Sequence, residues 1–356
     1  MKRVLACALI ILIVLIPVPS VSAKVSVSAG SAVLYSPFDN EVYYSLNENK
    51  HMKPASTTKI LTALITLEYA EKNNKQVEFE ESMTAEGSSM YLKYGEVVTL
   101  KDLAVGILMC SGNDAANAAA ISIAGSTERF ADLMNKRAKK IGMKNTHFVT
   151  PSGLDDKEHY STAYDMALLM AEALKNPEFS RLTSEKSETV TFIKPADKSV
   201  TYSNHNRLLS LYEYCVGGKT GYTMAAGRCL LSAAVKDGLT LIAVTMNDKN
   251  DWQDHASLYN YGFENHTMRV LDDTDFYLEV DVVGGEEASV IASSEDCGGV
   301  VVSPSDFSNV ERKLRLDNFL YAPVKKGQKL GTIEYYLNNK KIAEHTLTAM
   351  NSVGNG

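Results

Sequence analysis

One short stretch, Pro54-Ala55-Ser56-Thr57-Thr58-Lys59, constrains this chain more than any other, because it places a hydroxyl and an amine one helical turn apart. Pro54 cannot lie inside a helix, whereas a serine followed by two threonines is typical of a helix start. A serine hydroxyl is a poor nucleophile unless a neighbouring base takes its proton. Lys59 is the nearest base, provided that burial or a second cation lowers its pKa. The spacing therefore predicts a nucleophile, Ser56, and its base on one turn.

The helix that follows this turn is predicted to be buried. Its apolar density before Asn73-Asn74 indicates the centre of a domain, with Ile60, Leu61, Leu64, Ile65 and Leu67. A buried helix would hold its first turn still. Read alone, however, Ser-x-x-Lys also fits a capping serine beside a solvated lysine, and that arrangement is the commoner one.

A second stretch, Ser111-Gly112-Asn113, favours the catalytic interpretation. It follows a helix predicted to begin at Thr99, and Asp114 is expected to open the next, alanine-rich helix. Ser111 and Asn113 are therefore predicted in an inter-helix loop, with side chains free to converge on a cleft. A plain turn with a helix cap would explain this stretch if it stood by itself.

The third stretch is Lys219-Thr220-Gly221-Tyr222, which we predict on a β-strand. Gly217 and Gly218 precede it and would let another backbone or a ligand approach closely. Any one of the three stretches is weak, but all three in this order and at these spacings are far more specific.

The order of predicted elements indicates an α+β domain in which helices accompany an antiparallel sheet. Residues 31–46 predict an opening hairpin, and residues 227–246 predict another through Asp237-Gly238. An amphipathic helix is predicted from Ser126 or Thr127 to Gly142, and a last helix closes the domain near residue 265. The chain beyond Pro177 is predicted to be β-like.

The 356 residues divide into three predicted parts. Residues 1–23 predict an export signal, because Lys2 and Arg3 precede a short apolar run and a small-residue cleavage site at Ala23. Cleavage after Ala29 and an uncleaved membrane anchor are alternatives. Residues 24–265 form the main domain, and residues 270–350 hold short strand-like runs that predict a small, separate all-β domain.

Charge and cysteine content exclude several classes of function. The formal net charge is −7 with no basic stripe, so a nucleic-acid partner is not expected. No His-x-x-x-His or Cys-x-x-Cys spacing predicts a metal, and no cofactor is expected. Four cysteines lie beyond the signal, and although an exported chain permits disulfides, we predict free, buried thiols at Cys110, Cys215, Cys229 and Cys297.

With these motifs in hand, the chain resembles the low-molecular-mass penicillin-binding proteins, specifically the serine D-alanyl-D-alanine carboxypeptidases of peptidase family S11. The resemblance covers residues from about 31 to 265 and includes Pro-Ala-Ser-Thr-Thr-Lys, Ser-Gly-Asn-Asp-Ala-Ala, Tyr-Ser-Thr-Ala and Lys-Thr-Gly-Tyr-Thr. It implies a β-lactamase/transpeptidase-like domain. The stretch Pro323-Val324-Lys325-Lys326-Gly327-Gln328 is similar to the β-domain that those enzymes carry.

The resemblance also implies a role for each site residue. Ser56 would attack the carbonyl between the last two D-alanines of a peptidoglycan stem pentapeptide, Lys59 would take its proton, and Ser111, hydrogen-bonded near Lys59, would relay it to the leaving amine. Asn113 would hold a substrate amide. Lys219 and Thr220 of the Lys219-Thr220-Gly221 motif would bind the terminal carboxylate, and the N–H groups of Ser56 and Tyr222 would form the oxyanion hole. Penicillin and other β-lactam antibiotics would acylate Ser56.

Two departures from the family limit this transfer. Some relatives carry an arginine where this chain has His205, and we hypothesise that a protonated His205 assists carboxylate binding. Many relatives end in an amphipathic helix that holds them on the membrane, and none is predicted here. We therefore expect an exported, extracytoplasmic protein, with peripheral membrane association kept as an alternative.

Three other functions remain as alternatives at this stage. A class A β-lactamase would carry a deacylating Glu-x-x-Leu-Asn string, and none occurs between Asn113 and Lys219. A D,D-endopeptidase would use the same residues on peptide cross-links. A catalytically silent wall-binding protein would not need all five of Ser56, Lys59, Ser111, Asn113 and Lys219.

Overall fold

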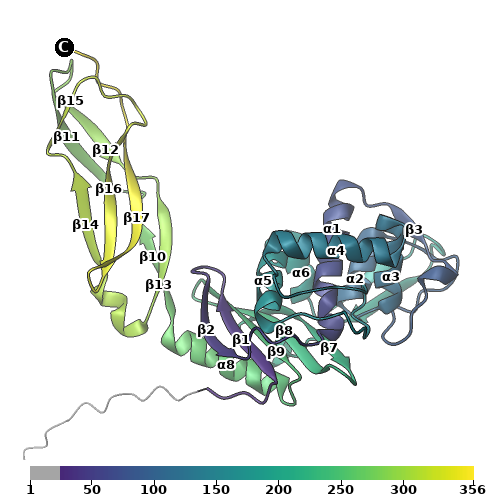
Figure 1. The fold of residues 1–356 in the computed structure, drawn as a ribbon. Coiled ribbons are helices and arrows are strands. Elements are labelled where there is room, and N and C mark those ends of the chain that lie inside the picture. Colours follow the sequence, from purple (N-terminus) through teal and green to yellow (C-terminus); the bar gives the residue numbers. More distant parts are fainter. Residues whose placement is uncertain (1–24) are drawn as a thin grey trace, which may run out of the picture.

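The computed structural model describes residues 25–356, so the predicted signal 1–23 lies outside the described residues. Figure 1 shows a wider body that contains helices and a sheet, and an elongated body made of strands, joined where α8 (Asp251–Asn265) leads into β10 (Thr267–Asp272). The predicted α+β architecture with a following all-β part is confirmed. No helix within residues 25–356 is long and apolar enough to cross a membrane.

The wider body is built on a five-stranded antiparallel sheet in the order β2-β1-β9-β8-β7. Its strands are β1 (Ser31–Ser36), β2 (Glu41–Leu46), β7 (Cys215–Thr223), β8 (Gly227–Lys236) and β9 (Leu239–Met246). Both predicted hairpins are confirmed, and Asp237 and Gly238 at the β8–β9 turn have the positive φ angles that such a turn requires. β7 is an edge strand, so one of its sides is free to face a cleft.

Helices cover both faces of this sheet (Figure 1), because alternate residues of its central strands enter different cores. Ile242 and Val244 of β9 join the large core formed with α1 (Lys59–Lys72), α2 (Leu100–Leu108), α3 (Asn113–Ala124), α4 (Thr127–Ile141) and α5 (Ala163–Ala173). Leu241 and Ala243 pack instead against Leu258 and Tyr259 of α8. As predicted, α1 is buried, and the sheet and helices hold its first turn from several sides.

One part of the predicted chain order is wrong. The segment after Pro177 is not β-like at first but forms α6 (Pro177–Ser184). Pro177 occupies the first helical turn and Asn176 caps it by accepting from Phe179 N, which together form a favourable helix start. The strands β5 (Ser187–Thr191) and β6 (Ser199–Ser203) and the short α7 (Leu208–Leu211) come only after this helix.

Several short elements surround Ser56 and the start of α3. A 3-10 turn, η1 (Ala55–Thr58), leads directly into α1, so Ser56 lies in the turn and Lys59 is the first residue of the α-helix. The small β3 (Gln76–Glu78), η2 (Glu81–Met83) and β4 (Val97–Thr99) flank a loop that crosses the start of α3. That helix begins at Asn113, one residue earlier than predicted.

The elongated body consists of a six-stranded sheet, a β10–β13 pair and a 3-10 turn, η3 (Pro304–Asn309). Its remaining strands are β11 (Tyr277–Val283), β12 (Ser289–Ser293), β13 (Cys297–Val302), β14 (Glu311–Leu316), β15 (Phe319–Tyr321), β16 (Lys329–Leu337) and β17 (Lys340–Ala349). Its two apolar clusters contain no residue before Leu271, so this body has cores of its own.

The four cysteines of residues 25–356 are free thiols, as predicted. Cys229 is buried, and Cys110 and Cys215 are half-buried. Cys297 is exposed at the start of β13, so the prediction that all four are buried is wrong there.

Candidate active site

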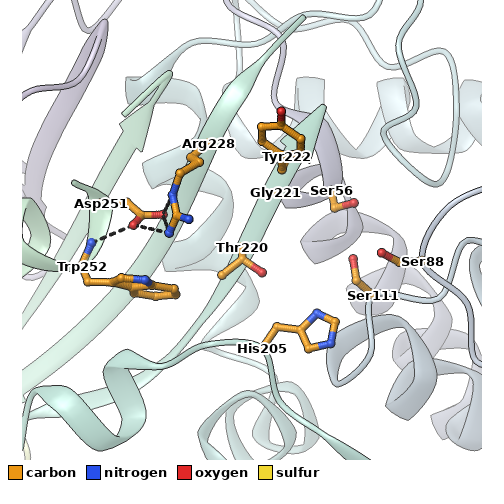
Figure 2. Close-up of a pocket in the computed structure, with 10 residues that line it drawn as sticks. All are labelled: Ser56, Ser88, Ser111, His205, Thr220, Gly221, Tyr222, Arg228, Asp251 and Trp252. Atoms are coloured by element: carbon orange, nitrogen blue, oxygen red, sulfur yellow. Dashed lines mark hydrogen bonds and ion pairs between the residues drawn. The ribbon is translucent and has the colours of Figure 1, made fainter. Parts of the chain in front are cut away.

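A cleft of about 510 Å³ lies along the free side of β7 and brings together residues from distant parts of the chain (Figure 2). It is lined by Ser56, Ser88, Ser111, His205, Thr220, Gly221, Tyr222, Arg228, Asp251 and Trp252. Six of these ten were predicted from sequence, and Lys59 and Lys219 lie immediately behind them, buried.

The Ser56 hydroxyl and the Lys59 amine are in contact, as the spacing predicts. Lys59 Nζ lies 3.0 Å from Ser56 Oγ, because the 3-10 turn and the start of α1 place both side chains on one face. Burial lowers the pKa of Lys59 well below its usual value of 10.5, and the nearby charge of Lys219 lowers it further. Both conditions that a lysine base requires are therefore met.

Two further acceptors surround the Lys59 amine. Its Nζ donates to Asn113 Oδ1 and to the Ser152 carbonyl oxygen, each at 2.6 Å. A neutral amine has two N–H groups and one lone pair, so these two acceptors account for both N–H groups and leave the lone pair for the Ser56 hydroxyl. None of the three contacts carries a negative charge, and the charge of Asp114, which raises the pKa of Lys59, has less influence than burial.

Ser152 was not predicted as a site residue, since a backbone carbonyl has no signature in sequence. The glycine beside it explains how the loop reaches Lys59. Gly153 has φ +79°, and a Cβ there would lie 1.9 Å from the Ala55 carbonyl oxygen, so a side chain cannot be accommodated. This close approach of the loop to η1 brings the Ser152 carbonyl to the base.

Ser111 contacts the second lysine, not the first. Its Oγ accepts a hydrogen bond from Lys219 Nζ at 3.0 Å, so Lys219 is the partner of the hydrogen bond that was expected near Lys59. Lys219 also donates to the Thr220 carbonyl, and burial lowers its pKa to about 8. Lys219 is buried and does not line the cleft, but it is bonded to Ser111, which does.

Asn113 lies behind the cleft, not on its surface. Its side chain is 4% exposed, and while Oδ1 accepts from Lys59, Nδ2 donates to the Glu86 carbonyl. Both ends of the amide are therefore engaged before any substrate arrives. In this arrangement Asn113 orients the base and ties it to the loop that contains Glu86.

Gly221 permits the close approach of β7 to the nucleophile. A Cβ at this position would lie 3.0 Å from both Ser56 N and Thr57 N, tighter than side chains ordinarily pack. The edge strand and the start of η1 thus present their backbones to one space. Thr57 N is already bonded to the Pro54 carbonyl at 3.2 Å, so Ser56 N is the donor that a helix start leaves without an intrahelical partner. Tyr222 follows on the same strand, and its side chain is 65% exposed at the rim.

His205 lines the cleft, but its environment disfavours a positive charge. Burial lowers the pKa of His205 below its usual 6.5, and the charge of Lys219 lowers it further. At neutral pH the imidazole is therefore uncharged, so the hypothesis of a cationic His205 does not hold there. A neutral His205 still offers one N–H donor to a ligand.

The exposed cation of the cleft is Arg228, which sequence reasoning missed. Its guanidinium makes a bidentate ion pair with Asp251, with contacts of 2.6–3.1 Å, and Trp252 packs beside it. Arg228 is 45% exposed, whereas Asp251 is 4% exposed and fixed at the start of α8. The pairing of β7 with β8, which neither predicted hairpin includes, places Arg228 opposite Tyr222.

Comparison with known proteins gives one consistent family. Residues 18–250 match the family described as D-alanyl-D-alanine carboxypeptidase, and residues 263–355 match the C-terminal domain of penicillin-binding protein 5. D-alanyl-D-alanine carboxypeptidase DacF of Bacillus subtilis is 33% identical over 98% of this chain and 94% of its own length. DacC of Escherichia coli is 33% identical over 93% of this chain and 86% of its own length.

Solved structures agree with this similarity. Penicillin-binding protein 5 from Haemophilus influenzae superimposes with a TM-score of 0.71 at 31% identity, covering 92% of this chain and 98% of that structure. Penicillin-binding protein 6B from Escherichia coli gives a TM-score of 0.71 at 28% identity over 90% of this chain and 95% of that one. Both bodies of the molecule are therefore shared with these relatives.

Proposed function

The chain belongs to the D-alanyl-D-alanine carboxypeptidase family, and we propose that Ser56 is the nucleophile with which it removes the terminal D-alanine of peptidoglycan stem peptides. The observation that carries this assignment is the contact of the Ser56 hydroxyl with a buried amine whose two other neighbours are both acceptors. In its neutral form, Lys59 would accept the hydroxyl proton as Ser56 Oγ attacks the carbonyl carbon. The N–H groups of Ser56 and Tyr222 would receive the negative charge on the carbonyl oxygen.

The leaving amine needs a proton, and Ser111 is placed to supply it. Its hydroxyl can donate to the departing nitrogen, while Lys219, 3.0 Å away, replaces that proton. D-Alanine then leaves, and water attacks the acyl group on Ser56. Before this second step, the proton that Lys59 took from Ser56 would pass to solvent and Lys219 would regain one, so that neutral Lys59 could accept a proton from the attacking water.

The terminal carboxylate of the substrate would bind Thr220 and Arg228. Lys219 was expected to bind it directly, but this side chain is 2% exposed and already bonded to Ser111. Thr220 and Arg228 both line the cleft, and Arg228 presents the free edge of its guanidinium while Asp251 holds the other edge. Asp251 would thus hold Arg228 in position to bind the terminal carboxylate, a group that only the end of a peptide carries.

We further propose that the chain is exported and acts outside the cytoplasmic membrane, with the signal removed after Ala23. Residues near the alternative site are integrated in the fold. Ser28 donates from N to Asp254 Oδ2 and from Oγ to Asp248 Oδ1, and Val27 packs against the α8 core. Cleavage after Ala29 would remove these contacts and leave the buried Asp254 carboxylate without the two donors that Ser28 supplies.

The test is mass spectrometry after treatment with penicillin, followed by incubation with a pentapeptide that ends in two D-alanines. We expect a persistent adduct on the peptide that contains Ser56, and release of one D-alanine per turnover by untreated protein. The Ser56→Ala variant should show neither. Rapid loss of the adduct would favour a β-lactamase, and cleavage of cross-linked dimers without release of D-alanine would favour an endopeptidase.

A further inference from the structure

Two tyrosines project into solvent from the loop that follows Ser88, a residue of the cleft lining. Tyr91 and Tyr94 are the most exposed aromatic side chains of residues 25–356, at 78% and 81%. Their neighbours Met90 and Leu92 are buried, so the loop is anchored inward at alternate positions and presents its rings outward. Large exposed aromatic side chains beside a cleft are typical of a binding surface.

The loop that carries these tyrosines is fastened to the catalytic motif. The buried carboxylate of Asp114 accepts hydrogen bonds from Ser89 Oγ at 2.7 Å, Met90 N at 2.8 Å and Leu92 N at 3.1 Å. Asn113 N donates to the Ser88 carbonyl at 2.7 Å, and Ser88 itself lines the cleft. The loop is therefore held in a fixed position at the site, and Tyr91 is its first strongly exposed side chain after Ser88.

The backbone of Tyr91 is strained in the same way as two residues of the catalytic motifs. Apart from glycine, asparagine and aspartate, the residues of 25–356 with positive φ are Ala55 at 48°, Ser111 at 59° and Tyr91 at 61°. Ala55 precedes the nucleophile and Ser111 lies in the cleft. Such strain is costly for a bulky residue and concentrates at functional sites, so its presence at Tyr91 indicates a role beyond connecting two strands.

The direction of the substrate leads toward this loop. Figure 2 shows Arg228 and Trp252 on one side of Thr220, and Ser56, Ser111 and Ser88 on the other. If the terminal carboxylate lies at Arg228, the remaining stem peptide leaves past Ser88. Four extended residues separate the reacting carbonyl from the sugar and span about 14 Å. Tyr91, three residues from Ser88, lies within about 11 Å of it along the chain.

We propose that Tyr91 and Tyr94 form a saccharide-binding surface for the glycan strand that carries the stem peptide. A pyranose ring has an apolar C–H face and polar hydroxyl edges, which match the apolar face and the hydroxyl of tyrosine. The inference rests on the proposed function, because the substrate direction depends on Ser56 and Arg228. It adds that the enzyme binds its substrate as a polymer and not only as a peptide end.

The experiment compares two substrates of the full-length protein: a soluble pentapeptide ending in two D-alanines, and polymeric peptidoglycan strands that carry the same peptide. The variants are Tyr91→Ala, Tyr94→Ala and the double variant. Tyr91→Phe keeps the ring, and Tyr69→Ala removes a tyrosine that is 42% exposed on α1 and far along the chain from the loop. Thermal unfolding confirms that each variant is folded.

We expect the double variant to lose about tenfold in kcat/KM on the polymer, mostly through KM, with the pentapeptide rate unchanged. Tyr91→Phe should retain most of the polymer rate, and Tyr69→Ala should match the parent on both substrates. Equal rates of parent and double variant on the polymer would overturn the proposal, as would equal losses on both substrates. Failure of the proposed function is distinguishable, because the parent protein would then release D-alanine from neither substrate.

Discussion

The two bodies of this molecule each bury an ionisable group, and they compensate it in opposite ways. In the cleft, the contacts of Lys59 are a hydroxyl, an amide and a carbonyl, none of them charged. In the β-domain, Asp273 is equally buried but is bound by Arg312, His345 and Tyr335 at 2.7–3.1 Å. The Lys59 amine has no oppositely charged contact, whereas the Asp273 carboxylate is balanced by the positive charge of Arg312 and by hydrogen bonds from Tyr335 and His345.

This difference affects the pKa of each group. Burial lowers the pKa of Lys59 well below its usual 10.5, and the charge of Lys219 lowers it further. Burial alone would raise the pKa of Asp273, but hydrogen bonds from Tyr335, His345 and Arg312 outweigh it, and the net shift is downward. The contrast indicates that the cleft is arranged for chemistry and the Asp273 network for holding strands together. The predictions below test that division.

The largest expected effect is on catalysis. Lys59→Met removes the base and should lower the rate of Ser56 acylation about 10³–10⁴-fold. Its methionine fills similar volume in an uncharged site, so the melting temperature should change little. Stopped-flow acylation by a chromogenic β-lactam and calorimetry measure the two quantities. A variant that retains more than a tenth of the parental rate would show that Lys59 is not the base.

A variant in the β-domain should have the reverse effect, with lower stability and unchanged acylation. Asp273→Ala leaves Arg312 and His345 without their acceptor and should lower the free energy of unfolding of that domain by about 3 kcal/mol. Acylation should be unaffected, because no catalytic residue contacts the network. Asp275→Ala, an exposed carboxylate two residues away, is the matched control and should stay within about 0.5 kcal/mol of the parent. If Asp273→Ala lost acylation while its free energy of unfolding stayed unchanged, the comparison would be contradicted.

Activity and stability should also respond to different ranges of pH. Acylation requires neutral Lys59, so its rate should fall about tenfold per unit as the pH drops below the lowered pKa of that amine. It should fall again above pH 8, because Lys219, with a pKa of about 8, loses its charge there. Acylation rates across pH 4–10 test both limbs, and a flat profile would contradict the assignment of either lysine.

For Asp273, the pH affects the stability of the β-domain and not the rate of acylation. Its folded-state pKa is below the unfolded value of about 3.8, so its stabilisation is complete above that value and is lost as the pH falls through the folded-state pKa. Unfolding of the β-domain should therefore become easier only below about pH 4. Denaturant titrations at pH 3 and pH 6 measure the change, and the Asp273→Ala variant should lack it.

The smallest expected effect concerns recognition. Arg228→Gln removes the exposed cation and should raise KM for the pentapeptide about tenfold, with kcat little changed. Asp251→Asn should produce a smaller rise, because Arg228 stays in place but loses its fixed orientation. Steady-state release of D-alanine measures both constants. An unchanged KM in Arg228→Gln would remove this residue from carboxylate binding.

Much of the site was predictable because local spacing determines it. Ser56 and Lys59 meet through a single helical turn, and the Asp237-Gly238 turn sets the pairing of β8 with β9, the two strands beside the β7 strand that carries Lys219. What sequence could not supply were contacts made across distant segments. The Ser152 carbonyl reaches Lys59 from 93 residues away, and Ser111 pairs with Lys219, which is 108 residues away. The short helix α6 was not predicted because it has only eight residues, and its cap at Asn176 is followed closely by the β-like residues of β5.

The most direct test of the central claim is a titration of Lys59 itself. With lysine side chains labelled with ¹³C at Cε, NMR from pH 5 to 11 reports the protonation of each amine. We expect one resonance, absent in Lys59→Met, to titrate well below 10.5, with a second near 8 from Lys219. If the resonance lost in Lys59→Met titrates at or above 10 in the parent protein, Lys59 is a cation at neutral pH and cannot take the proton from Ser56.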